Sequence, residues 1–156
     1  MIKNIVEKKD PLLARLDDSP FVFYLTGSRF FTPKETNDLT DFDFFVEDSE
    51  EVRSFLIKKG FFCQYGAHNY QDDWCIDVFS SYKKTSGVDI KIRKIDIQLI
   101  KPAAGIDSKI AIQFLLYKYE LIAKTKDKKI HKLLWRAMFN AYLDGNMSGA
   151  LMKKKG

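Results

Sequence analysis

Residues 41–47 constrain the fold of this chain most strongly, because two acidic side chains lie within an otherwise apolar run. Side chains two positions apart in a β-strand point to the same face of the sheet. A strand here therefore places Asp41, Asp43 and Phe45 on one face. The opposite face receives Phe42, Phe44 and Val46. The apolar face needs helices packed under it, so this stretch predicts a sheet that is covered at least on one side.

The apolar periodicity of the whole chain predicts an α+β fold. Helices are expected within residues 2–16 and over residues 50–59, the latter following the N-cap pair Asp48–Ser49 and ending at Gly60. After residue 108 the period becomes helical, which predicts two helices up to residue 143. Strands are expected over residues 21–26, 41–47, 61–65, 74–82 and 88–100, the last as one long strand or two short ones.

These elements predict a mixed sheet of four or five strands with helices on one face. Residues 1–103 would form the sheet domain, and residues 104–156 a C-terminal helical section packed on it. The hydrophobic fraction of 46% is ordinary for a globular protein and suffices for a sizeable core.

The pair Asp41 and Asp43 indicates a cation site. Two carboxylates this close on one face repel, and neither ionises easily without a compensating charge. A divalent cation supplies that charge, and hard oxygen ligands at this spacing suit Mg²⁺, whose coordination is usually completed by substrate phosphates and water.

Gly27 and Ser28 follow the buried strand predicted over residues 21–26, and twelve residues separate them from Asp41. A glycine lets the backbone approach a phosphate closely, and the Ser28 hydroxyl with neighbouring N–H groups can bind phosphate oxygens. Arg29 follows directly and is a further candidate for phosphate contact, with a solvated loop charge as the alternative. One element would thus hold a triphosphate and the other its metal ions.

A two-metal site needs a third carboxylate on a neighbouring strand. Asp96 and Asp89 both alternate with apolar residues, but they are seven positions apart and would face opposite sides of one continuous strand. We prefer Asp96, whose apolar segment is longer and leads directly to Pro102. Asp77 is a weaker third candidate.

The sequence Gly27-Ser28, a twelve-residue spacer, Asp41-Phe42-Asp43 and the later Ile95-Asp96-Ile97 resembles the signature of the DNA polymerase β-like nucleotidyltransferase superfamily. The similarity covers roughly residues 20–101. It implies that Asp41, Asp43 and Asp96 bind two Mg²⁺ ions and that Gly27 and Ser28 contact the β- and γ-phosphates. It also implies transfer of a nucleoside monophosphate from a nucleoside triphosphate, such as ATP, to a hydroxyl with release of pyrophosphate.

Other interpretations of the same residues stay open. The acids could be ordinary strand-edge carboxylates beside an ordinary turn, or the chain could be a nucleotidyltransferase fold without catalysis that binds nucleic acid or a protein. The formal net charge is +5, and basic residues are frequent from Lys118 to Lys155. These favour RNA or tRNA as the acceptor, with a solvated helix face as the alternative. Self-association is conceivable on size alone.

The cysteine pattern and the apolar runs bear on location. Cys63 and Cys75 lie in strand-like segments and are expected to be free thiols of a reducing compartment. No apolar run approaches the length of a membrane span, so we expect a soluble cytoplasmic protein without membrane contact. His68 and His131 have no metal-ligand spacing and are not expected to bind a metal.

Overall fold

A six-stranded mixed sheet forms the centre of the protein in this computed structural model, which describes residues 2–3, 13–63, 78–82, 93–100, 108–127, 129–131, 133–134 and 137. The spatial order of the strands is β1-β2-β3-β6-β5-β4. Their bounds are Ile2–Lys3 (β1), Phe23–Thr26 (β2), Phe42–Glu47 (β3), Phe62–Cys63 (β4), Val78–Ser80 (β5) and Ile95–Ile100 (β6).

The two central strands, β3 and β6, run parallel and carry the acidic residues. Asp43 is the register partner of Asp96. On the other side of β3, the antiparallel strand β2 places Thr26 opposite Asp43, and on the other side of β6, the antiparallel strand β5 places Ser80 opposite Asp96. Residues in register share a face of the sheet, so these four side chains form one row across four strands.

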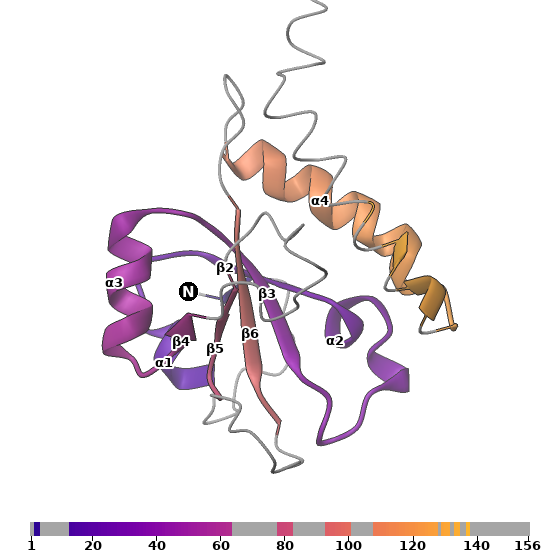
Figure 1. Ribbon diagram of the computed structural model, residues 1–156, viewed down its shortest axis with the longest axis horizontal. Helices are drawn as coiled ribbons and strands as arrows, with labels where there is room; N and C mark the ends of the chain where they lie inside the picture. The colour runs from indigo at the N-terminus through magenta and orange to yellow at the C-terminus, as the bar shows by residue number, and fades with distance from the viewer. Residues whose placement is uncertain are drawn as a thin grey trace, which may run out of the picture.

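One face of the sheet is sealed by α1 (Ala14–Asp17) and α3 (Glu50–Lys58), as Figure 1 shows. The side chain of Ser49 caps α3 by accepting from the N–H of Val52 at 3.1 Å, which confirms the predicted helix start. The core on this face consists of aromatic and aliphatic side chains from both layers, among them Leu16, Phe23, Phe42, Phe44, Val46, Leu56, Ile95 and Ile97.

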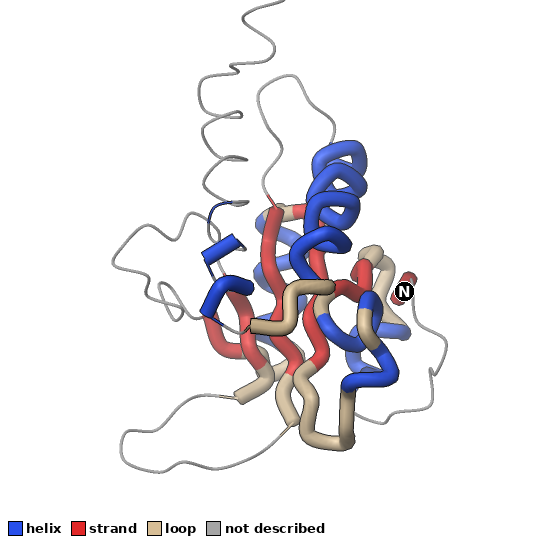
Figure 2. Tube along the Cα trace, turned by 90° about the vertical axis from the view of Figure 1, so that its right-hand side faces the viewer, coloured by secondary structure: helices blue, strands red, loops and turns tan. Residues whose placement is uncertain are grey.

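The opposite face is covered by α2 (Ser28–Phe31) and α4 (Ser108–Ala123), which lie in front of the strands in Figure 2. Here the inner residues of α4 pack on Tyr24, Phe45 and Ile100. Helix α4 packs through an apolar stripe that includes Ile112, Leu115 and Leu116, and it lies within residues 104–156, which were predicted to form a helical section packed on the sheet domain. The α+β class and the mixed sheet are confirmed, with six strands in place of four or five.

The extra strand is β1, a two-residue edge strand that pairs in parallel with β2 within a segment predicted as helical. Such a short strand leaves no periodic signal. Between β2 and β3 the chain forms α2 and a 3₁₀ turn, η2 (Pro33–Glu35). The helical period resumes at residue 129 after a non-helical stretch at residues 125–127, in accord with the two helices predicted after residue 108. The predicted domain boundary near residue 103 lies outside the described residues.

Candidate active site

The polar row of the sheet, which we define as Thr26, Asp43, Asp96 and Ser80, lies on the face that α2 and α4 cover. Thr26, Ser80 and Asp96 are buried, and Asp43 is partly buried. Only 4% of the surface of Asp96 is exposed. Gln98, two residues beyond Asp96 on the same face, hydrogen-bonds the Asp43 side chain. The strand alternation that builds the opposite core thus brings two carboxylates together in a largely enclosed place.

Asp41 precedes β3 and lies beside this row through a contact with Lys94, the residue before β6. Its Oδ1 accepts a hydrogen bond from the backbone N–H of Lys94 at 3.2 Å. The Lys94 ammonium in turn lies 3.5 Å from Oδ2 of Asp96. Asp41, Asp43 and Asp96, which are separated by up to 55 positions in the sequence, therefore share one electrostatic environment.

The electrostatics of the carboxylates reflect this proximity. Burial, together with the charges of Asp96 and Asp41, raises the pKa of Asp43 to about 8, against the lowering effect of the Gln98 hydrogen bond and the Lys94 charge. Burial and the Asp96 charge also raise the pKa of Asp41, while the Lys94 N–H, the Lys94 charge and Arg29 oppose the shift. A site that makes carboxylate ionisation this costly is one that an additional cation would stabilise.

Gly27 joins this group by direct contact. A Cβ placed on Gly27 would lie 2.6 Å from Oδ2 of Asp43, which is closer than side chains tolerate. Its backbone has φ +70° and ψ −161°, a region that is essentially restricted to glycine. Ser28 is exposed at the first position of α2. The predicted phosphate-binding turn and the predicted metal-binding acids are therefore neighbours.

Arg29 holds the loop that precedes Asp41 by hydrogen bonds to its backbone. Its Nε and Nη2 donate to the carbonyl of Thr40 at 2.8 and 2.6 Å, and Nη2 also donates to the carbonyl of Asn37 at 3.0 Å. The guanidinium carbon lies 4.0 Å from the centroid of the Phe42 ring. These contacts give Arg29 a positioning role toward Asp41, and its predicted phosphate contact stays a prediction.

Helix α4 adds an aromatic wall to the site. The Tyr119 ring stacks on Phe31 of α2 with centroids 5.5 Å apart, and its hydroxyl lies 3.3 Å from Nε2 of His131. Burial and, to a smaller extent, the charge of Asp43 raise the pKa of Tyr119 above its ordinary value. Burial lowers the pKa of His131, against hydrogen bonds with the backbone of Thr125 and Ile122 that raise it.

The donor chemistry of the polar row fits a divalent cation. Three buried oxygens, Thr26 Oγ1, Asp96 Oδ1 and Gln98 Oε1, have no hydrogen-bond partner among the described residues. Buried oxygens of this kind are ordinarily satisfied, and a cation or a hydrogen-bond donor beside them would satisfy them. Within the described ranges, however, no three His, Cys, Asp or Glu side chains converge closely enough to hold an ion as they stand. The ligand set Asp41, Asp43 and Asp96 stays a prediction.

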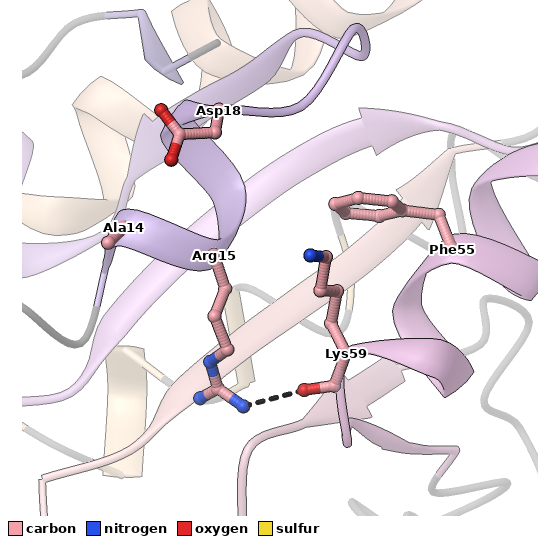
Figure 3. Close-up of a pocket in the computed structure, with 5 residues that line it drawn as sticks. All are labelled: Ala14, Arg15, Asp18, Phe55 and Lys59. Carbon is pink, nitrogen blue, oxygen red and sulfur yellow. Dashed lines mark hydrogen bonds between the residues drawn. The ribbon is translucent and has the colours of Figure 1, made fainter.

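A separate surface pocket of about 250 Å³ lies between α1 and the end of α3, on the other face of the sheet (Figure 3). It is lined by Ala14, Arg15, Asp18, Phe55 and Lys59, and the Arg15 guanidinium donates to the Lys59 carbonyl at 2.8 Å. The guanidinium also lies 4.5 Å from the Phe61 ring centroid. These contacts hold α1 to the end of α3, and the pocket has no part in the acid site.

Sequence reasoning missed Lys94, Gln98, Thr26 and Tyr119. Two of them had a detectable signal, because Lys94, Asp96 and Gln98 alternate with Ile95 and Ile97 along β6. Tyr119 had none, since the packing side of α4 depends on the sheet it meets. Asp89, Asp77, His68 and Cys75 lie outside the described residues, while Cys63 is partly buried at the end of β4.

The basic C-terminal surface is described only in part. Lys118, Lys124, Lys126 and Lys129 are exposed, and Lys124 lies 4.0 Å from Glu120. Lys128, Lys132 and Arg136 lie outside the described residues. In the part of the chain that the structure describes, no helix has the length and apolar character needed to cross a bilayer.

Comparisons with known proteins return no match: no family model, no curated protein and no solved structure is significantly similar to this chain.

Proposed function

We propose that this protein is a nucleotidyltransferase, which transfers a nucleoside monophosphate from a nucleoside triphosphate to a hydroxyl acceptor and releases pyrophosphate. The observation that carries this proposal is the register of Asp43 with Asp96 on adjacent parallel strands, with Gly27 against the Asp43 carboxylate. This arrangement brings a carboxylate pair and a side-chain-free turn together, which is what binding a metal-chelated triphosphate requires.

The residues would divide the work as follows. Asp43 and Asp96, with Asp41 after release of its bond to the Lys94 N–H, would hold Mg²⁺, which supplies charge stabilisation to the transferring phosphoryl group. Asp96 would also assist the removal of the proton from the acceptor hydroxyl. The absence of a Cβ at Gly27 makes room for the Asp43 carboxylate beside the turn, and the exposed Ser28 hydroxyl would bind a phosphate oxygen. Arg29 would hold the 37–40 loop so that Asp41 stays near β6.

The acceptor that we favour is RNA or tRNA. The exposed lysines at the end of α4 and beyond it, Lys118, Lys124, Lys126 and Lys129, provide a positively charged surface at the side of the sheet where α4 lies. Phosphate backbones bind such surfaces without sequence preference. Base choice and the identity of the acceptor hydroxyl do not follow from these charges.

The test is a label-transfer assay. The protein is incubated with each of the four α-³²P-labelled ribonucleoside triphosphates, Mg²⁺ and total tRNA, bulk RNA or protein, and label is followed on gels. We expect transfer to RNA from at least one nucleotide, and its loss in the Asp41→Asn/Asp43→Asn double variant with an unchanged circular dichroism spectrum. Absence of transfer with every nucleotide, together with absence of Mg²⁺-dependent nucleotide binding in calorimetry, would rule the proposal out.

A second candidate is a nucleotidyltransferase fold without catalysis that binds nucleic acid or a protein through its C-terminal helices. The observation in its favour is the position of the Lys94 ammonium, 3.5 Å from Asp96. Lys94 thus supplies a positive charge to the three carboxylates Asp41, Asp43 and Asp96, which we call the acid group. Salt-dependent RNA binding that is unaffected by the Asp41→Asn/Asp43→Asn change, without label transfer, would favour this second function.

A further inference from the structure

Lys94 is held at the centre of the acid group by its backbone. Its N–H donates to Oδ1 of Asp41 at 3.2 Å, and its carbonyl accepts from the N–H of Phe42 at 2.9 Å. These two bonds tie the start of β6 to the start of β3, so the Cα of Lys94 has a fixed position beside the carboxylates. The side chain, in contrast, is a flexible four-carbon stem that ends in a compact charge.

The Lys94 ammonium lies in the position of a counter-cation. It is 3.5 Å from Oδ2 of Asp96, and its charge acts on both Asp41 and Asp43. The pairing is incomplete, because Oδ1 of Asp96 is buried and has no partner among the described residues. The Lys94 charge thus acts on three carboxylates, with Arg29 as a second charge at Asp41, and one buried oxygen stays unsatisfied, which a multidentate ion would correct.

The two members of the ion pair also differ in their access to solvent. The Lys94 side chain is 31% exposed, whereas the Asp96 side chain is 6% exposed. A lysine head group at this boundary can move into water while its stem stays packed, but the carboxylate cannot follow it. The mobile partner of the pair is therefore the cation.

We propose that Lys94 is a tethered counter-cation, which neutralises the acid group in the metal-free protein and moves into solvent when a divalent ion takes its place. This inference rests on the proposed function, because it assumes that the same acids bind the ion. It adds a regulation of that site: Lys94 lets the carboxylates stay close together without metal, and it weakens metal binding by competing for the same oxygens.

The experiment compares Mn²⁺ binding by isothermal titration calorimetry in four proteins. Lys94→Gln removes the charge, Lys94→Arg keeps it, and Lys58→Gln removes an equal charge from α3 on the other face of the sheet. We expect Lys94→Gln to bind Mn²⁺ about tenfold more tightly than the wild type, since a nearby cation no longer opposes the ion. Lys94→Arg and Lys58→Gln should bind within about twofold of the wild type, because the local charge is kept in the first and distant in the second.

A second measurement follows thermal unfolding in chelator and in Mn²⁺. Metal-free Lys94→Gln should melt below the wild type, because its carboxylates have lost their counter-charge, and Mn²⁺ should raise its melting temperature more than that of the wild type. If Lys94→Gln does not fold, the ¹⁵N- and ¹³C-labelled lysine side chains of the wild type are followed during a Mg²⁺ titration. Departure of the ammonium from the acids should shift the Lys94 signals and leave those of Lys58 in place.

The outcomes separate this inference from the proposed function. Equal or weaker Mn²⁺ binding by Lys94→Gln, or Lys94 signals that do not shift on Mg²⁺ binding, would overturn the inference and leave the metal site intact. Binding by Lys94→Gln alone would support the inference, with Lys94 excluding the ion, and overturn the proposed activity of the wild type. No binding by either protein would overturn both.

Discussion

The two faces of strand β3 are built from alternate residues of one short segment, yet one face stabilises the fold and the other carries the acidic residues. Phe42 and Phe44 point into a core that is sealed by α3, with ring centroids 6.4 Å apart. Asp43, which lies between them in sequence, points to the other face, into a row with Thr26, Asp96 and Ser80. The apolar face therefore stabilises the sheet, while the polar face uses that rigidity to hold like charges close together.

The largest effect is expected on the apolar face. Phe44 is fully buried and contacts Phe23 edge to face at a centroid distance of 6.5 Å. Phe44→Ala should lower the free energy of unfolding by about 3–5 kcal/mol, through lost burial and a residual cavity. Urea unfolding followed by fluorescence measures this loss, and a loss below about 1 kcal/mol would show that this face is not the main core.

On the polar face, removal of the Asp43 charge should raise the free energy of unfolding at a pH where this carboxyl would otherwise ionise. The pKa of Asp43 is raised from about 4 in the unfolded chain to about 8 in the folded protein, so the native state binds more protons over this interval. The stability contribution is then fully present below about pH 4 and is lost as the pH rises through about 8, where burial and the charges of Asp41 and Asp96 oppose ionisation.

The measurement is thermal unfolding of metal-free protein between pH 5 and pH 9. The melting temperature of the wild type should fall with rising pH through this window, despite the Lys94 charge, and that of Asp43→Asn should fall less. Divalent ions should reduce the difference at high pH. Parallel pH profiles for the two proteins would contradict the assignment of this penalty to Asp43.

The contact between the turn and the acids is tested at Gly27. Gly27→Ala should destabilise the protein by about 2–4 kcal/mol, because it combines a conformation restricted to glycine with a clash against Oδ2 of Asp43. Gly60→Ala is the matched control: its φ is +86°, but its added Cβ would lie 3.7 Å from Nη1 of Arg15, an ordinary contact. Equal losses for the two variants would show that Asp43 does not press on Gly27.

The sequence predicts the apolar face of the sheet better than the polar face. Alternation was enough to separate Phe42 and Phe44 from Asp43, and the Ser49 cap was enough to start α3. A helical section after residue 104 was predicted to pack on the sheet domain, but the face that α4 covers was not, because that choice depends on which sheet face is free. Asp96 was preferred to Asp89 because its apolar segment is longer and leads directly to Pro102. Its register with Asp43 depends on strand order, which no local pattern encodes. Lys94 was overlooked because a lone lysine at the start of a strand is usually a solvated charge.

The smallest effect concerns the wall that α4 places over the polar face. The hydroxyl of Tyr119 lies 3.3 Å from Nε2 of His131, and its ring stacks on Phe31, so Tyr119→Phe keeps the ring contact and removes one hydrogen bond. The expected loss is about 0.5–1.5 kcal/mol in the free energy of unfolding, the range for a single partly buried hydrogen bond. Tyr117→Phe, two residues away on the exposed side of the same helix, should change stability by less than about 0.5 kcal/mol. If the two variants are equally stable in urea, the Tyr119 hydroxyl does not join α4 to the segment that begins at residue 129, and the wall over the acids is held by ring packing alone.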